Sequence, residues 1–136
     1  MVKKVSIEIK RSDDDSKIIY CCVDLIGDFC KLIHKKNKEK KFRLIAHAIF
    51  RNITTKDIFE KYKDFEGTCV LKLEKGGDNT RLYCKLVNIK GENKTSIQKI
   101  IIAKIYNKKE QVLSKKSKGY LKSIQKSEYE YKSTIA

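Results

Sequence analysis

The 136-residue sequence contains no proline, no tryptophan, only six glycines and only two histidines. No segment rich in proline, glycine or serine divides it, so nothing resembles an interdomain linker, and the length suits one domain. It also has no run of about 18 apolar residues and no apolar stretch of the signal-peptide type near its start. We therefore expect one domain over residues 1–136, located in the cytoplasm, with no membrane contact.

Most sequence signatures of enzymes are missing as well. The chain has no P-loop, no glycine-rich dinucleotide fingerprint and no H-E-x-x-H zinc motif. Its five cysteines (Cys21, Cys22, Cys30, Cys69 and Cys84) include no C-x-x-C pair, which favours reduced core residues over zinc ligands or nucleophiles. We expect His34 to be exposed and His47 to lie on a helix surface or in the core. No metal and no cofactor is predicted.

Acidic residues are scarce relative to basic ones. The chain has 32 lysines and arginines against 17 acidic residues, a formal net charge of +15. Such a charge repels itself, so an anionic partner is expected, and phosphate backbones are the most common one. A different origin is codon bias in an AT-rich genome, which enriches lysine, asparagine and isoleucine without any partner.

Apolar periodicity in the first half predicts a hairpin followed by helices. Apolar and polar residues alternate over 5–10, and 17–23 are β-rich, which together indicate an N-terminal β-hairpin within 1–25. Over 28–52, apolar positions recur at helical spacing, with Asp28 as N-cap. One long helix or an antiparallel pair bent at the lysine run fits, and we prefer the pair. Thr54 or Thr55 is expected to cap a further short helix, so helices cover 28–64.

The second half changes to β-rich runs. Residues 68–73, 81–87 and 99–106 are separated by turn-forming segments, which predicts a three-stranded antiparallel meander over 68–107. A helical pattern returns over 110–132. The expected fold class is therefore α+β, an antiparallel sheet with an N-terminal β-hairpin, a helical hairpin packed on it, the meander and a C-terminal helix.

Basic residues concentrate towards the C-terminal end. Nine lysines and one acidic residue lie between Lys99 and Lys126, a phosphate-binding composition. Four tyrosines there offer rings for stacking of exposed bases, although ordinary packing is the alternative for each: Tyr106, Tyr120, Tyr129 and Tyr131. Strand parity also places Lys72, Arg81 and Lys104 on one face of the sheet. The residues predicted to bind nucleic acid are Lys75, Lys85, Lys104, Lys115, Lys116, Lys118 and Lys122.

Short motifs in residues 65–118 resemble the RelE/ParE superfamily of toxins from type II toxin–antitoxin systems. They are the strand Val70-Leu71-Lys72-Leu73-Glu74, the arginine strand Thr80-Arg81-Leu82-Tyr83-Cys84, the apolar strand Ile100-Ile101-Ile102-Ala103-Lys104-Ile105 and the lysine pair in Asn107-Lys108-Lys109. The resemblance implies a RelE-like fold, ribosome-dependent cleavage of messenger RNA without a metal ion, and inhibition by a cognate antitoxin protein.

The resemblance also implies roles for individual residues. By position, Lys72 matches a lysine of the sheet, Arg81 the phosphate-binding arginine, and Lys108 or Lys109 the basic residue after the final strand, with Tyr120 as the C-terminal tyrosine. Two alternatives stay open. The chain is a non-catalytic module that binds nucleic acid or the ribosome, or it is a gyrase-targeting toxin of the ParE branch that needs no nuclease site.

Overall fold

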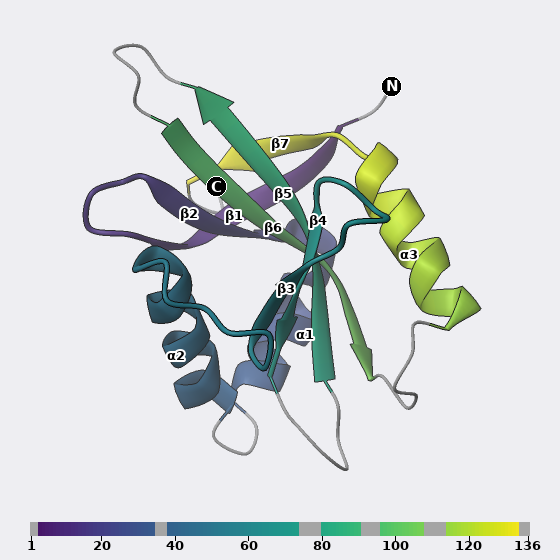
Figure 1. Cartoon of the computed structure of the whole chain (residues 1–136), viewed down its shortest axis with the longest axis horizontal. Coiled ribbons are helices and arrows are strands. Elements are labelled where there is room, and N and C mark those ends of the chain that lie inside the picture. The colour runs from purple at the N-terminus through teal and green to yellow at the C-terminus, as the bar shows by residue number, and fades with distance from the viewer. Residues whose placement is uncertain (1–2, 35–37, 74–79, 91–95, 108–113, 134–136) are drawn as a thin grey trace.

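The computed structural model describes residues 3–34, 38–73, 80–90, 96–107 and 114–133, whose strands form one seven-stranded sheet (Figure 1). The strand order is β3-β4-β5-β6-β2-β1-β7. Along the chain the elements are β1 (Lys4–Arg11), β2 (Lys17–Cys22), η1 (Val23–Leu25), α1 (Ile26–Ile33), α2 (Lys38–Phe50), β3 (Phe59–Lys61), β4 (Thr68–Lys72), β5 (Thr80–Lys90), β6 (Ser96–Asn107), α3 (Lys115–Lys126) and β7 (Tyr129–Lys132).

The N-terminal hairpin forms from β1 and β2, which pair antiparallel. One oxygen of Asp14 closes the turn, because it accepts hydrogen bonds from the Ser12 hydroxyl and from both the backbone and the hydroxyl of Ser16. These bonds favour the ionised carboxylate and lower the pKa of Asp14 to about 2. The side chains of the turn thus specify its conformation, as Asp and Ser commonly do in hairpins.

Two helices follow, as the apolar stripes indicated. The rings of Phe29 in α1 and Phe42 in α2 meet edge to face, with their centroids 5.2 Å apart. The helix start differs from the prediction. Since α1 begins at Ile26 and follows a short 3-10 turn, Asp28 lies in the first turn of the helix and is not its N-cap. An acidic residue there still interacts favourably with the helix dipole.

The short helix expected after Thr54 or Thr55 is wrong. Residues 59–61 form strand β3, in which Phe59 pairs with Leu71 and Lys61 with Cys69. Aromatic residues suit a half-buried strand, and pairing along β4 satisfies backbone groups that a single isolated helical turn would leave open.

The expected antiparallel, RelE-like fold class is also wrong, because the sheet is mixed. β2 runs parallel to β6, and β1 runs parallel to β7. Residues 18–22 of β2 are all buried, which suits a strand covered on both faces, and the helices supply the long connection that a parallel pair requires. The hairpin is therefore an integral part of the sheet and not an extension of it.

The helix expected over 110–132 is shorter in the structure. α3 covers Lys115–Lys126, Ser127 has extended backbone angles, and Tyr129–Lys132 forms β7 beside β1. The part of the prediction at 110–113 lies outside the described residues. In β7 two tyrosines alternate with charged residues. This two-residue alternation is typical of a strand and explains why the helix does not continue to residue 132.

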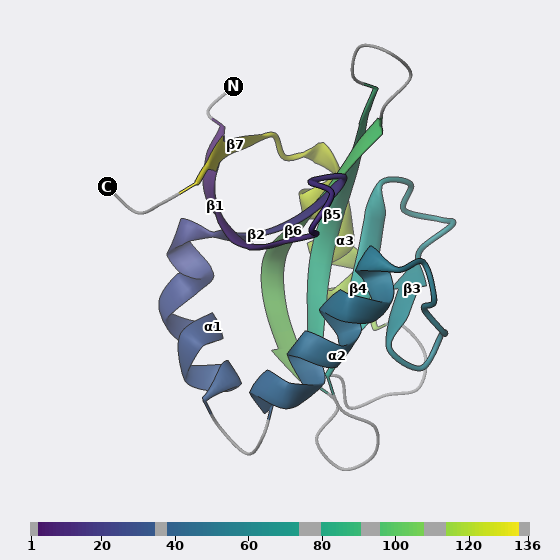
Figure 2. The same ribbon diagram turned by 90° about the vertical axis from the view of Figure 1, so that its left-hand side faces the viewer.

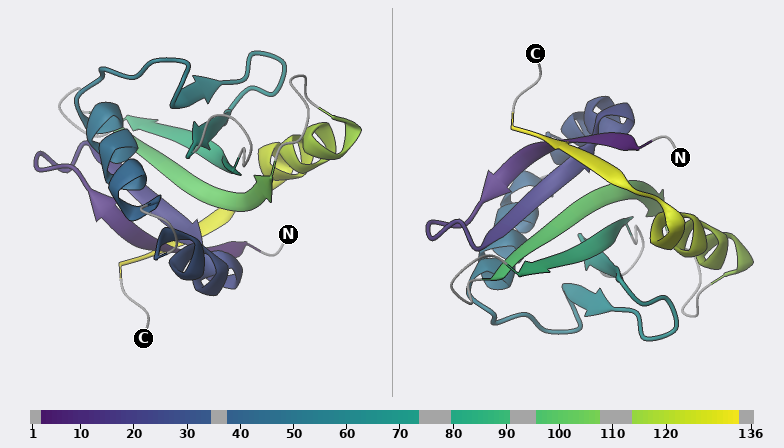
Figure 3. Two further views of the ribbon diagram at one scale, coloured as in Figure 1. Left: turned by 90° about the horizontal axis from the view of Figure 1, so that it is seen from below. Right: turned by 90° about the horizontal axis from the view of Figure 1, so that it is seen from above.

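The helices divide between the two faces of the curved sheet (Figures 2 and 3). α1 and α2 cover a largely apolar core made with Leu71, Leu82, Ile100 and their neighbours on the same face. Lys38, the first residue of α2, is also buried and donates to the Thr80 hydroxyl. α3 packs on the opposite face through Leu121 and Ile124, against Val70 and Tyr83. Within the described ranges, none of the helices has the length and apolar character needed to cross a bilayer.

Candidate nucleic-acid interface

The face of the sheet under α3 carries cations and tyrosines on alternate positions of β4, β5 and β6. Lys72 lies opposite Arg81, and Arg81 lies opposite Tyr106. Tyr83 and Lys104 form the next pair along the same face. Because side chains two residues apart on a strand share a face, the structure brings Lys72, Arg81 and Lys104 to one side of the sheet.

Four tyrosines, Tyr62, Tyr83, Tyr106 and Tyr120, form a continuous line of rings that we call the tyrosine row. The ring centroids of successive members are 6.4, 6.1 and 5.6 Å apart. Tyr83 is fully buried, whereas the other three are half-buried and reach the surface. Aromatic rings held this way are stacking platforms for unpaired bases.

Helix α3 presents lysines on the side opposite its buried stripe. Lys115, Lys118, Lys122 and Lys126, which we call the lysine stripe, are exposed and recur at helical spacing, while Ser117, Leu121 and Ile124 are buried against the sheet. None of the four forms an ion pair with a carboxylate of the described residues. The stripe is thus open to an external anion.

The helix dipole makes the start of this stripe unfavourable for the isolated protein. The first turn of α3 contains Lys115 and Lys116 and no acidic residue. Cations near a helix N-terminus cost about 0.3–1 kcal/mol each, whereas a phosphate there is stabilised by both the dipole and the free backbone N–H groups. Ser114 satisfies one such group, since its hydroxyl accepts from the Ser117 N–H at 3.1 Å. A bound phosphate would offset the remaining cost.

One hydrogen bond and one cation–π contact join α3 to the tyrosine row. The Tyr83 hydroxyl lies 2.9 Å from the Ser117 hydroxyl in the buried contact between sheet and helix. The Lys104 ammonium lies 4.5 Å from the centroid of the Tyr120 ring. These contacts fix the row and the stripe relative to each other, so the two form one surface.

Other predicted site residues serve the fold. The Lys72 ammonium donates to Glu60 at 2.9 Å and to the Lys56 carbonyl at 2.8 Å. The Lys85 ammonium donates to the carbonyls of Gln125 and Ser127, where it caps the C-terminal end of α3. Lys72 is therefore paired with a carboxylate, and Lys85 positions α3.

Arg81 is half-buried beside the tyrosine row and donates to the Thr80 carbonyl at 3.4 Å. Burial raises the pKa values of Tyr62 and Tyr83 above the ordinary phenol value, and the charge of Arg81 opposes this only weakly. Both phenols are therefore neutral at physiological pH. Neutral phenols at Tyr62 and Tyr83 beside a guanidinium do not repel a phosphodiester, as ionised phenols would.

The remaining predicted residues are in other places. Lys75, Lys108 and Lys109 lie outside the described residues. Tyr129 is the buried first residue of β7, and Tyr131 packs on Tyr20 with the Lys99 ammonium 3.7 Å from its ring centroid, so neither belongs to the tyrosine row.

Sequence reasoning missed two members of the tyrosine row, Tyr62 and Tyr83. For Tyr83 a signal was present, because it lies two residues after Arg81 in the same strand and so shares its face. Tyr62 gives no comparable signal, because the sequence predicts a helix for this segment and the alternation of side chains along a strand therefore does not apply to it.

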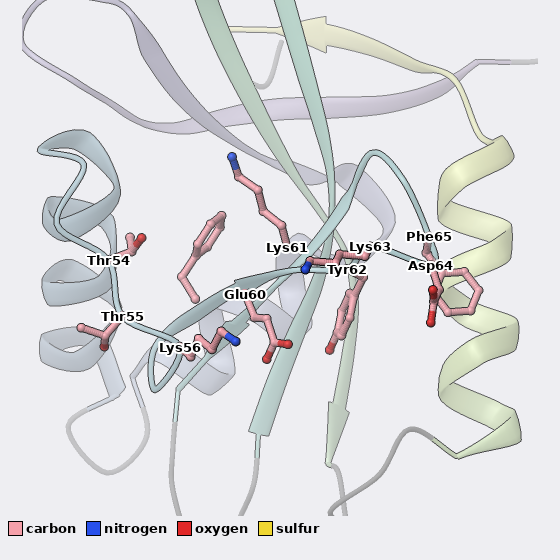
Figure 4. A pocket seen from close by; sticks show the side chains of 10 residues that line it. Thr54, Thr55, Lys56, Glu60, Lys61, Tyr62, Lys63, Asp64 and Phe65 are labelled. Atoms are coloured by element: carbon pink, nitrogen blue, oxygen red, sulfur yellow. The ribbon is translucent and has the colours of Figure 1, made fainter.

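An open hollow of about 590 Å³ lies at the β3 end of the tyrosine row (Figure 4). Thr54 and Thr55 line it on the side of α2, and Asp64 and Phe65 line it next to α3. Tyr62 lines the hollow and is also the first ring of the row. The row thus continues into a concave surface rather than ending at the sheet edge.

The cysteines and histidines lie away from this surface or are unreactive. Burial raises the pKa of the Cys21 thiol to about 12 and that of Cys22 to about 11, so both are protonated thiols at neutral pH. Cys69 and Cys84 are also buried, whereas Cys30 is exposed on α1, contrary to the core position expected for it. His34 and His47 are both exposed.

No protein-family model, no curated protein and no solved structure matches this chain. The resemblance to RelE/ParE toxins therefore stays a prediction. The functional argument rests on the geometry of the tyrosine row, Arg81 and the lysine stripe.

Proposed function

We propose that the protein binds single-stranded RNA in the cytoplasm, across the surface formed by the tyrosine row and the lysine stripe. The observation that carries the proposal is the connection between the two. Tyr120, the last ring of the tyrosine row, belongs to α3, the helix that presents the lysine stripe, so half-buried rings lie directly beside exposed lysines that pair with no described carboxylate. Unpaired bases stack on such rings while lysines follow the backbone.

A duplex suits this surface less well. Its bases are already stacked on each other, so the rings of Tyr106 and Tyr120 have no free base to contact. A single strand exposes base faces and phosphates together. We therefore expect the protein to bind an unpaired strand more tightly than a duplex of the same sequence and the same salt concentration.

The test is fluorescence anisotropy with a labelled single-stranded RNA. Replacing both Tyr106 and Tyr120 by leucine retains apolar bulk but removes the rings. Since each stacked base contributes about 1–3 kcal/mol, the double variant should bind at least about tenfold more weakly. The matched control is Tyr131→Leu, which removes a half-buried tyrosine outside the row and should bind like wild type. Equal binding by all three proteins would refute the proposal.

Cleavage of the bound RNA, as the resemblance to toxins implies, is the second candidate. It is favoured by the placement of Lys72 and Arg81 opposite each other on neighbouring strands. In that reaction the 2′-oxygen attacks the adjacent phosphorus and loses its proton to water, while the bond from phosphorus to the 5′-oxygen breaks. Arg81 stabilises the added negative charge, and the neutral phenol of Tyr62 is available to protonate the leaving 5′-oxygen. A cognate antitoxin would then be a partner.

Two measurements test this candidate. Labelled RNA incubated with the protein and a chelator should yield discrete fragments, and Arg81→Ala should abolish them. Induced expression should arrest growth for wild type only. Intact RNA and full growth, combined with tight RNA binding, would leave binding as the function.

A further inference from the structure

A second, smaller pocket opens where α3 meets β6, β7 and η1. Its volume is about 190 Å³. The buried or half-buried residues that line it are Cys22, Leu25, Ala103, Ile124 and Tyr129, and more exposed residues, Lys4, Asp24 and Ser123, line it together with Lys104 and Tyr120. The pocket thus has both apolar and polar walls with charged groups at its border, so an occupant finds apolar contact and hydrogen-bond partners together.

The volume selects a small planar group. A cavity of about 150 Å³ admits benzene, while drug-sized ligands occupy about 300 Å³ or more. A space of about 190 Å³ therefore accommodates one six-membered heterocycle with its exocyclic atoms. This is the size of a pyrimidine base and too small for a complete nucleotide.

The polar groups at the pocket are suited to the edge of such a base. Tyr129 is 6% exposed, and its buried hydroxyl forms no hydrogen bond of normal geometry among the described residues, although the Ser127 side chain lies close to it. A buried polar group without a partner is costly, and an occupant that reaches it supplies the missing bond. Asp24 at the border is an acceptor of the kind that pairs with the exocyclic amino group of cytosine.

The position of the pocket connects it to the proposed RNA surface. Tyr120 and Lys104, which contact each other, both line the pocket, and Tyr120 is the ring of the tyrosine row that lies on the same helix as the lysine stripe. Ser123 lines it from α3, next to Lys122 of the stripe. A strand that follows the stripe therefore passes the pocket, and Lys4 and Lys104 lie beside it to contact the flanking phosphates.

We propose that this pocket binds one unstacked cytosine base of the RNA. The proposal rests on the proposed function and adds a base preference to it. The other contacts on the surface are base stacking on tyrosine rings and lysine contacts with phosphates, and neither kind distinguishes one base from another.

The test uses a short RNA with one cytidine beside one 2-aminopurine between adenosines. The fluorescence of 2-aminopurine is quenched by stacking on its neighbours and increases when the cytosine leaves the stack. Binding to wild type should increase the fluorescence severalfold. Ser123→Phe fills the pocket from the exposed side of α3 and should abolish the increase. The matched control is Cys30→Phe, which adds the same ring at an exposed position of α1 away from the pocket and should preserve the increase. Anisotropy measured on the same samples reports RNA binding independently.

A second variant, Tyr129→Phe, removes only the hydroxyl. Since that hydroxyl lacks a described partner, the melting temperature should stay the same or rise, while affinity for the cytosine-containing strand should fall about fivefold relative to an all-adenosine strand. RNA binding with unchanged fluorescence, or an unaltered fluorescence increase in Ser123→Phe, would overturn the pocket proposal alone. Absence of any RNA binding by wild type would overturn it together with the proposed function.

Discussion

The two faces of the sheet are built from neighbouring residues of the same strands, yet they differ completely in chemistry. In β5, Leu82 points into the wholly buried core under α1 and α2, whereas Arg81 and Tyr83 point to the α3 side. The first face uses aliphatic side chains and thiols with little exposure. The second combines tyrosines and cations and is only partly covered.

Because successive side chains of a strand point to opposite faces, one strand can supply residues for stability on one face and residues for recognition on the other. A core face must exclude water and tolerates no unpaired charge, whereas a face that binds a polyanion needs charge at the surface. On the α3 side the cations also divide into two groups. Lys72 and Lys85 are held by protein oxygens, and the lysine stripe is not held by any described carboxylate. Of these two groups, the stripe is the one open to phosphate without loss of a described internal contact.

The largest effect is expected from reversing charges on the stripe. The triple variant Lys115→Glu, Lys118→Glu and Lys122→Glu removes three phosphate contacts, which lowers the salt slope of RNA binding by about 2. Extrapolated to about 0.1 M salt, this corresponds to roughly a hundredfold weaker binding. Anisotropy titrations at several salt concentrations measure both values.

A control with the same charge change separates contact from net charge. Lys10, Lys31 and Lys40 are exposed on β1, α1 and α2, away from α3. Replacing all three by glutamate should weaken RNA binding far less. If both triple variants lost affinity equally, the two faces would not differ in function, and the general positive charge alone would account for binding.

The next effect compares neighbours in β5. Leu82→Ala should lower the free energy of unfolding by about 2–5 kcal/mol, because it leaves a cavity in a fully buried core, and should leave the RNA affinity of the folded protein unchanged. Arg81→Ala should show the opposite balance: RNA binding should weaken, while the free energy of unfolding should fall by less than in Leu82→Ala. Urea denaturation and anisotropy on both variants test this directly. Equal stability losses would contradict the assignment of the faces.

Burial of Cys21 on the core face predicts a loss of stability at high pH. The thiol pKa is about 12 in the folded protein against 9.0 ordinarily, so the unfolded chain ionises first as the pH rises. The contribution of Cys21 to stability should therefore be constant below about pH 8 and fall by about 2 kcal/mol near pH 10.5, and the raised pKa of Cys22 should add to the loss in the same range. Urea titrations under reducing conditions measure this. Replacing the exposed Cys30 by serine should not change the profile, whereas a profile without any decrease above pH 9.0 would contradict the burial of the thiol.

The sequence allowed much of the local structure to be predicted. Alternation located β1 near residues 5–10, and the apolar stripes located α1 and α2, because both patterns report which side chains face a core. It did not predict the parallel pairing of β2 with β6, since pairing between strands more than 70 residues apart leaves no local pattern. It also mistook β3 and β7, which are three and four residues long, for helix. Such short edge strands are determined by their neighbours.

The candidate site was predictable only in part. Strand parity placed Lys72, Arg81 and Lys104 on one face, but sequence gives no means to tell an open cation from an occupied one. Lys72 is held by Glu60, a residue of β3 that was assigned to a helix. The function of a lysine depends on its partner, and the partner here came from the element that was predicted wrongly.

The smallest effect is expected from the pair of Lys72 and Glu60. Their side chains are 20% and 36% exposed, and such pairs contribute only about 0–1 kcal/mol. Lys72→Met and Glu60→Gln should therefore each change stability by less than about 1 kcal/mol, and RNA affinity should stay within about twofold of wild type, because an occupied lysine contributes little to an external phosphate. A large loss of RNA binding in Lys72→Met, with stability retained, would show that RNA displaces Glu60. Lys72 would then belong with the lysine stripe, and the case for a cleavage site at Lys72 and Arg81 would become stronger.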